Sequence, residues 1–148
     1  MNPFVESFVT VMPQLGFHDV KKGKLGVKSR DLIASGLIII VGIVGELRGN
    51  IVYCIGIEDA KKVASTMMMG MPVSDFDDLS RSALSELTNM LTANAATSFS
   101  RMGIVIDIST PTLLYGENIS VEMSSNQVLS VELIVDEMPI EVDIAFET

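Results

Sequence analysis

The stretch Gly36–Gly45, GLIIIVGIVG, is the most apolar run of the chain and decides the fold class. Ten residues are too few for a helix that spans a bilayer, which needs about 20. The β-branched content of the run favours a buried strand instead. A second apolar run, 50–57, follows directly after Glu46–Gly49 (ELRG), an arrangement typical of a β-hairpin. The two runs therefore predict a hairpin of buried strands.

The segments on either side of this hairpin complete an α+β pattern. Apolar periodicity predicts helices over 2–15, 58–69 and roughly 77–101. Beyond Gly103 the pattern predicts strands over 104–109, 112–115, 118–123, 127–135 and 139–146, separated by turn residues. The predicted fold is three helices packed on one large, mostly antiparallel sheet, within a single domain that spans 1–148.

Composition and charge exclude several classes of function. The chain has 148 residues, with 10 Lys and Arg against 19 Asp and Glu, which gives a net charge of −9. This balance argues against a nucleic-acid partner, because phosphate backbones are bound by basic surfaces. Five of the basic residues lie within 21–30, which indicates either a solvated loop and strand edge or a docking patch for an acidic partner. No signal peptide or membrane segment is recognised, so we expect a cytoplasmic protein without a membrane partner.

One cysteine and one histidine leave little material for a metal centre or a covalent mechanism. Cys54 lies in an apolar run and is interpreted as an inert core residue. His18 follows the first helix, in a polar stretch. Without a cluster of histidine and carboxylate ligands, we expect no metal site of the protein's own. The glycines at 42, 45 and 49 lack the Lys-Ser/Thr pair of a phosphate-binding loop.

The helix expected over 77–101 carries the most informative residues. With Ser82 at 0°, helical geometry places Glu86 about 40° away and Asn89 about 20° away on the other side, so the three share one narrow line. Small residues continue this line at Ala93, Ala96 and Ser100, which leaves room for another protein to come close. The opposite side carries the apolar stripe of Leu84, Leu87, Met90, Leu91 and Ala95.

The spacing continues beyond the helix as Ser82-x3-Glu86-x2-Asn89-x21-Pro111. This pattern resembles the signature of the CheC/CheX/FliY family of chemotaxis phosphatases. The blocks Gly42–Gly45, Gly49–Tyr53, Ala60–Met71 and Pro111–Thr112 are also similar to single-domain CheX proteins, in order and at similar distances. The resemblance covers essentially the whole chain and implies a CheX/CheC-like fold.

The first helix departs from the two-site pattern of CheC-type relatives. It offers Asn2-x3-Glu6-x2-Val9, so a valine stands where the second half has its carboxamide. Asp31 stands at the position that corresponds to the proline. The resemblance therefore implies one site per chain, as in CheX.

The resemblance implies hydrolysis of the aspartyl phosphate of a phosphorylated CheY-like response regulator. Asn89 would orient the attacking water, because an amide donates and accepts hydrogen bonds at once. Glu86 would pair with the regulator's active-site lysine. Ser82 would bound the site, Pro111 would shape the adjacent strand, and Ala93 and Ala96 would face the partner. The regulator would supply Mg²⁺, so no cofactor of the chain's own is expected.

Two alternatives stay open beside this phosphatase. A CheX-like binding module could dock on a chemotaxis or two-component protein without turnover. A structural role in the flagellar switch ranks last, because FliY-like relatives carry an additional domain and a docking tail. The resemblance also implies a homodimer joined edge to edge through its sheets, against a monomer with a blunted sheet edge.

Overall fold

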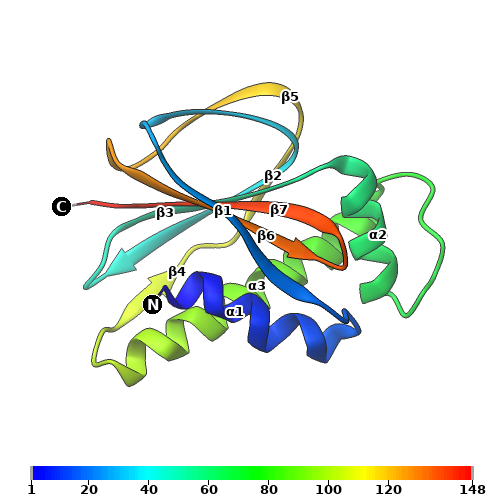
Figure 1. Ribbon diagram of the computed structural model, residues 1–148, viewed down its shortest axis with the longest axis horizontal. Helices are drawn as coiled ribbons and strands as arrows, with labels where there is room; N and C mark the ends of the chain where they lie inside the picture. The colour runs from blue at the N-terminus through cyan, green and yellow to red at the C-terminus, as the bar shows by residue number, and fades with distance from the viewer. Residues whose placement is uncertain (1, 148) are drawn as a thin grey trace.

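The computed structural model describes residues 2–147, and the predicted fold class is confirmed: three helices pack on a large antiparallel sheet (Figure 1). The helices are α1 (Pro3–Val11), α2 (Ile57–Met67) and α3 (Asp78–Arg101), with a 3₁₀ turn, η1 (Met12–Leu15), after α1. The strands are β1 (Val20–Lys28), β2 (Asp31–Gly45), β3 (Gly49–Ile55), β4 (Ile106–Ile108), β5 (Thr112–Glu122), β6 (Val128–Val135) and β7 (Met138–Phe146).

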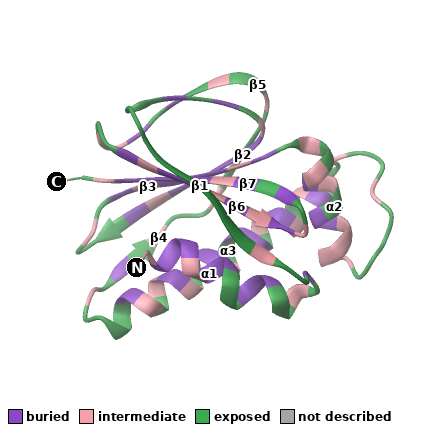
Figure 2. Ribbon diagram, in the orientation of Figure 1, coloured by how far each residue is buried: buried purple, intermediate pink, exposed green. Residues whose placement is uncertain are grey.

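The sheet has the strand order β1-β6-β7-β3-β2-β4, and β5 pairs with β2 on the side where β4 also lies. The predicted hairpin forms its middle, with Leu37 of β2 opposite Ile55 of β3 and Ile43 opposite Gly49. Both faces of this hairpin are covered, which explains an apolar run without alternation (Figure 2). Among the described residues, no helix is long and apolar enough to cross a membrane.

A second, smaller core lies on the sheet face opposite the helices. It exists because β2 begins at Asp31, five residues before the predicted start, and runs beside β5 in an arm that arches over this face (Figure 1). The buried members of this second core come from five strands and the turn after β5: Leu32, Ala34, Ile38, Val52, Val121, Met123, Val128 and Ala145.

Strand β5 is continuous, so the prediction of two separate strands over 112–115 and 118–123 is wrong. The residues interpreted as a turn form a β-bulge: the register shifts between Ala34 and Gly36 of β2, and β5 holds one extra residue there. Asn118 adopts a left-handed conformation with φ 52°, and its backbone N–H donates to Ser35 Oγ at 2.9 Å. Asparagine tolerates this conformation, so the same sequence signal serves a bulge or a turn.

The first helix and the basic stretch also differ from the sequence prediction. The first helix ends at Val11 instead of residue 15, because the chain tightens into η1 at Pro13 and stops at Gly16, whose φ is 102°. The basic stretch is mostly strand β1, an edge strand whose residues Lys21–Lys28 are all exposed. Lysines on an edge strand disfavour pairing with another chain, which is a structural reason for the charge cluster.

Capping residues at both ends determine where helix α3 begins and ends. The Asp77 carboxylate accepts a hydrogen bond from the Ser80 backbone N–H at 2.9 Å, and this bond holds the pKa of Asp77 below its usual range. At the other end Gly103 takes a left-handed φ of 81°. α1 packs against α3 through Phe4 and Phe99, whose ring centroids lie 5.6 Å apart. These contacts fix which face of α3 remains free.

Candidate active site

Ser82, Glu86 and Asn89, here called the polar strip, all lie on the exposed side of α3. The opposite side of the helix carries most of the predicted apolar stripe in the core, with one difference: Met90 is half-buried at its margin. The buried positions on α3 are Ser80, Leu84, Leu87, Thr88, Leu91, Thr92, Ala95 and Phe99. The polar strip is thus open to a partner from solvent.

The two polar groups of the strip that can do chemistry are both unengaged. Residues three apart on a helix have their Cβ atoms about 5–6 Å apart, so Glu86 and Asn89 can contact one small group together. Within residues 2–147 the Glu86 carboxylate forms no ion pair and the Asn89 carboxamide forms no hydrogen bond. The hydrogen bond recorded at Asn89 uses its backbone oxygen, which accepts from Thr92 Oγ1 at 3.3 Å. The amide is therefore free to bind a water molecule.

A shallow groove with a volume of about 340 Å³ runs beside the strip. One wall comes from α3 and the other from β4 and the residue that follows it. Its lining residues are Asn89, Thr92, Ala93, Ala96, Ile106, Asp107, Ile108 and Ser109. The groove thereby brings the predicted partner-facing residues Ala93 and Ala96 together with Asn89. The wall from β4 was not predicted, because nothing in the sequence shows that this strand lies along the helix.

The loop that carries Pro111 is fastened to α3 and to β2. Arg81 Nη2 donates to the backbone oxygen of Leu113 at 3.2 Å, which ties the start of β5 to the helix one residue before Ser82. Ser109 Oγ accepts from the Gly42 backbone N–H at 2.7 Å. Pro111 itself is half-buried between β4 and β5 and contributes no donor. Arg81 is a positioning residue that the sequence did not single out.

The groove has no positive charge of its own. Its described lining includes one carboxylate, Asp107, and no lysine or arginine. A phosphoryl group placed here would therefore need its charge neutralised by whatever carries it. The first helix has no equivalent feature, since Val9 is an exposed apolar residue and Glu6 is half-buried.

The sequence profile of the family described as "Chemotaxis phosphatase CheX" matches residues 37–133, a segment that includes the polar strip, the groove and Pro111. The chain belongs to this CheX family. The enzyme class expected from the sequence, a phosphatase, is confirmed by this membership and by a CheY-P phosphatase CheX of Thermotoga maritima. That protein is 33% identical over 115 residues, which cover 78% of this chain and 74% of the relative.

Solved structures of CheX proteins share the fold over nearly the whole chain. CheX of Borrelia burgdorferi, solved as a CheX–CheY–BeF₃–Mg²⁺ complex, is 33% identical and superposes with a TM-score of 0.81 over 99% of this chain and 96% of that one. A chemotaxis protein CheX of Desulfovibrio desulfuricans superposes with a TM-score of 0.85 at 22% identity, covering 98% and 97% of the two chains. The predicted CheX/CheC-like fold is confirmed.

Proposed function

We propose that this CheX family member hydrolyses the aspartyl phosphate of a phosphorylated CheY-like response regulator. The observation that carries the proposal is the free Glu86–Asn89 pair on an exposed helix face beside a groove with small walls. The relatives support the choice of substrate, because one is named a CheY-P phosphatase and another was solved with CheY, BeF₃ and Mg²⁺.

In this mechanism the Asn89 carboxamide orients a water molecule in line with the phosphorus atom. An acyl phosphate has a good leaving group, so positioning supplies most of what the reaction needs. The amide donates one hydrogen bond and accepts another, which fixes both the place and the orientation of the water. Among the described residues no basic side chain lines the groove, so the regulator's Mg²⁺ and lysine neutralise the phosphoryl charge and the chain needs no cofactor of its own.

Glu86 pairs with the regulator's active-site lysine and sets the register of the docked helix. A charge-assisted hydrogen bond of this kind contributes about 1.5–3 kcal/mol. Ser82 bounds the site one turn earlier, and Ala93 and Ala96 let the partner's backbone approach the helix. Pro111, held by the Arg81–Leu113 contact, shapes the chain behind the helix.

The same proposal includes a homodimer and a cytoplasmic location. The arm of β2 and β5 exposes apolar side chains at Ile33, Leu114 and Tyr115, which a homodimer contact would cover. The proposal also treats the protein as one domain over 1–148. It places the protein in the cytoplasm, where it would hydrolyse the regulator's phosphate.

The test uses a CheY-type regulator that is phosphorylated with a small-molecule phosphodonor, with phosphate release followed over time. The chain should accelerate dephosphorylation, and Asn89→Ala and Glu86→Lys should abolish most of the acceleration. Variants that hydrolyse as fast as the wild type would refute the assignment. Binding of the phosphorylated regulator without any acceleration would instead identify a CheX-like binding module.

A further inference from the structure

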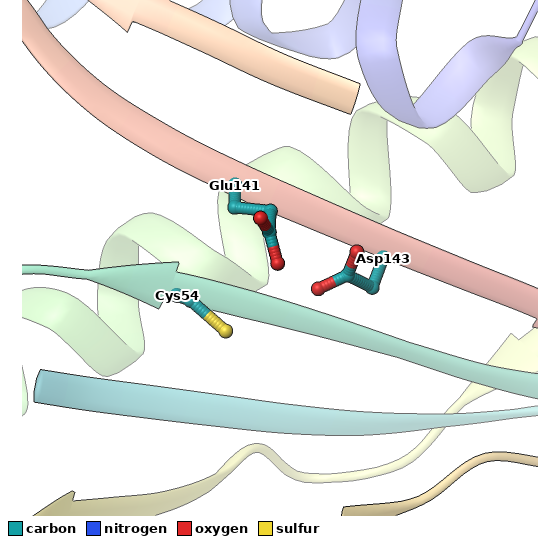
Figure 3. Close-up of side chains that lie close together, drawn as sticks. All are labelled: Cys54, Glu141 and Asp143. Atoms are coloured by element: carbon teal, nitrogen blue, oxygen red, sulfur yellow. The ribbon is translucent and has the colours of Figure 1, made fainter. Parts of the chain in front are cut away.

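A second group of polar side chains lies on the sheet face opposite the helices. Cys54 of β3 is the cross-strand partner of Glu141 of β7, and Asp143 follows two residues later on the same face of β7. Figure 3 shows the three side chains extending into the same space between the strands. The Cys54 sulfur and one oxygen from each carboxyl group lie within 4.8 Å of one another.

The Asp143 carboxylate is the member of this group that is both fully buried and without a hydrogen-bond partner among the described residues. Its exposed fraction is 0%, and neither carboxylate oxygen has a hydrogen-bond partner among the described residues. Ser130 and Glu141 lie close enough to influence its pKa, although neither forms a hydrogen bond with its oxygens. A buried carboxylate without partners is costly, so nearly all such groups in folded proteins are paired or bind a cation.

We propose that Cys54, Glu141 and Asp143 bind one divalent transition-metal cation, specifically Zn²⁺, between β3 and β7. A thiolate together with two carboxylates suits Zn²⁺, whereas Mg²⁺ and Ca²⁺ are bound by oxygen alone. Zinc lies about 2.3 Å from sulfur and about 2.0–2.2 Å from oxygen, so tetrahedral ligands are roughly 3.5 Å apart. The ligand atoms lie within 4.8 Å of one another, so binding requires side-chain rotations that shorten the separations by up to about 1.3 Å, with water in the fourth position.

The surroundings match the charge and the access that such a site needs. Three anionic ligands around a dication leave one negative charge, and the Lys28 ammonium balances it. Lys28 Nζ lies 2.9 Å from Glu141 Oε2, so it holds one oxygen of that carboxylate and orients the other. Cys54 and Glu141 are both half-buried, which gives an ion a path to Asp143 from this face.

A metal site was not expected from the sequence, because the strands that carry its ligands become neighbours only through pairing in the sheet. The ligands come from β3 and β7, which are far apart in the chain and become neighbours only in the sheet. The inference does not depend on the proposed phosphatase activity, because the site lies on the face away from α3.

The experiment measures metal binding by the full chain after treatment with a chelator and buffer exchange. Titrations at pH 8 with Zn²⁺, in competition with a chromogenic chelator, give stoichiometry and affinity. Burial and the adjacent carboxylates Asp143 and Glu141 raise the pKa of Cys54 to about 12, so the metal must displace the thiol proton and an alkaline buffer helps. Co²⁺ is the second probe, because a cobalt–thiolate bond produces a charge-transfer absorption band.

One Zn²⁺ per chain and a thiolate band with Co²⁺ are expected for the wild type. Cys54→Ser should remove the band, and both Cys54→Ser and Asp143→Asn should weaken Zn²⁺ binding at least ~100-fold, since each removes a ligand. Glu122→Gln, an exposed strand carboxylate, is the matched control and should bind as the wild type does. Sub-stoichiometric uptake, or equal affinity in Cys54→Ser, would overturn the proposal.

Thermal unfolding gives an independent readout that needs no enzymatic activity. A cation that joins β3 to β7 stabilises only the folded chain, so saturating Zn²⁺ should raise the Tm of the wild type and of Glu122→Gln. Cys54→Ser and Asp143→Asn should show no such rise, and their circular dichroism establishes that they are folded. A Zn²⁺-dependent rise that persists in both variants would place the ion elsewhere and refute the site.

Discussion

Replacement of Asn89 by alanine should lower the catalytic rate without lowering the stability of the fold. The Asn89 side chain is exposed and forms no hydrogen bond within the described residues, so its loss removes no intramolecular hydrogen bond. Alanine is a better helix former than asparagine by up to about 0.7 kcal/mol in a helix interior. Asn89→Ala should therefore keep or raise the Tm, by about 1–3 °C for a domain of this size. The rate of regulator dephosphorylation should fall about 10²-fold, because the water is no longer positioned.

The assay pairs thermal unfolding with phosphate release from a phosphorylated CheY-type regulator held at saturating concentration. Asn94→Ala is the matched control: it makes the same chemical change on the same helix, at a half-buried position outside the polar strip. It should gain similar helix stability and keep wild-type activity. Equal activities of the two variants would refute the role of Asn89, and a large loss of Tm in Asn89→Ala would refute the claim that its side chain is free.

Four further outcomes follow from the structure. Glu86→Lys should raise the KM for the phosphorylated regulator about 10- to 100-fold with an unchanged Tm, because it replaces a charge-assisted contact by repulsion. Ala93→Arg should weaken regulator binding measured by titration calorimetry, since a long side chain would fill the groove at an exposed position. Gly49→Ala should lower the Tm by about 3–10 °C, because a Cβ there would lie 2.9 Å from Phe146 Cα in the paired strand. Burial raises the pKa of Asp143 to about 7, so the native state keeps a proton that the unfolded chain, with an ordinary value of about 3.9, has lost. In chelator-treated protein the free energy of unfolding should therefore fall between about pH 4 and pH 7, by up to roughly 1.4 kcal/mol per pH unit, and this fall should largely disappear in Asp143→Asn.

The parts of the fold that the sequence predicted are those governed by local chemistry. Asp77 and Gly103 delimit α3 through caps that involve only neighbouring residues. The apolar run Gly36–Gly45 pairs with the next run because a short connection holds the two together. The exposure of the polar strip also follows from helical periodicity alone, since a residue's angle around the axis depends only on its number.

The parts that the sequence did not predict depend on contacts between distant segments. The extension of β2 back to Asp31 needs β5 beside it, and the bulge at Asn118 is defined by the residue of β2 that it faces. β1 has almost no buried side chain, so apolar periodicity, the main signal for a strand, is missing from it. Its strand conformation is imposed by pairing with β6.

The two candidate sites differ in the same way, and this difference explains why only one was visible in the sequence. The polar strip lies on a single helix, so spacings of four and three residues already bring Ser82, Glu86 and Asn89 to one line. The group at Cys54 exists because the register aligns this residue with Glu141, and a shift of one residue would turn the carboxylates of β7 toward the helices. In Asp143 the same alignment leaves a buried carboxylate without a hydrogen-bond partner among the described residues, beside the smaller apolar core. Such a group persists only if something compensates its burial, either a shared proton or a cation. Titration of the metal-free chain with Zn²⁺ distinguishes the two, because a site that holds only a proton has no reason to select a thiophilic metal.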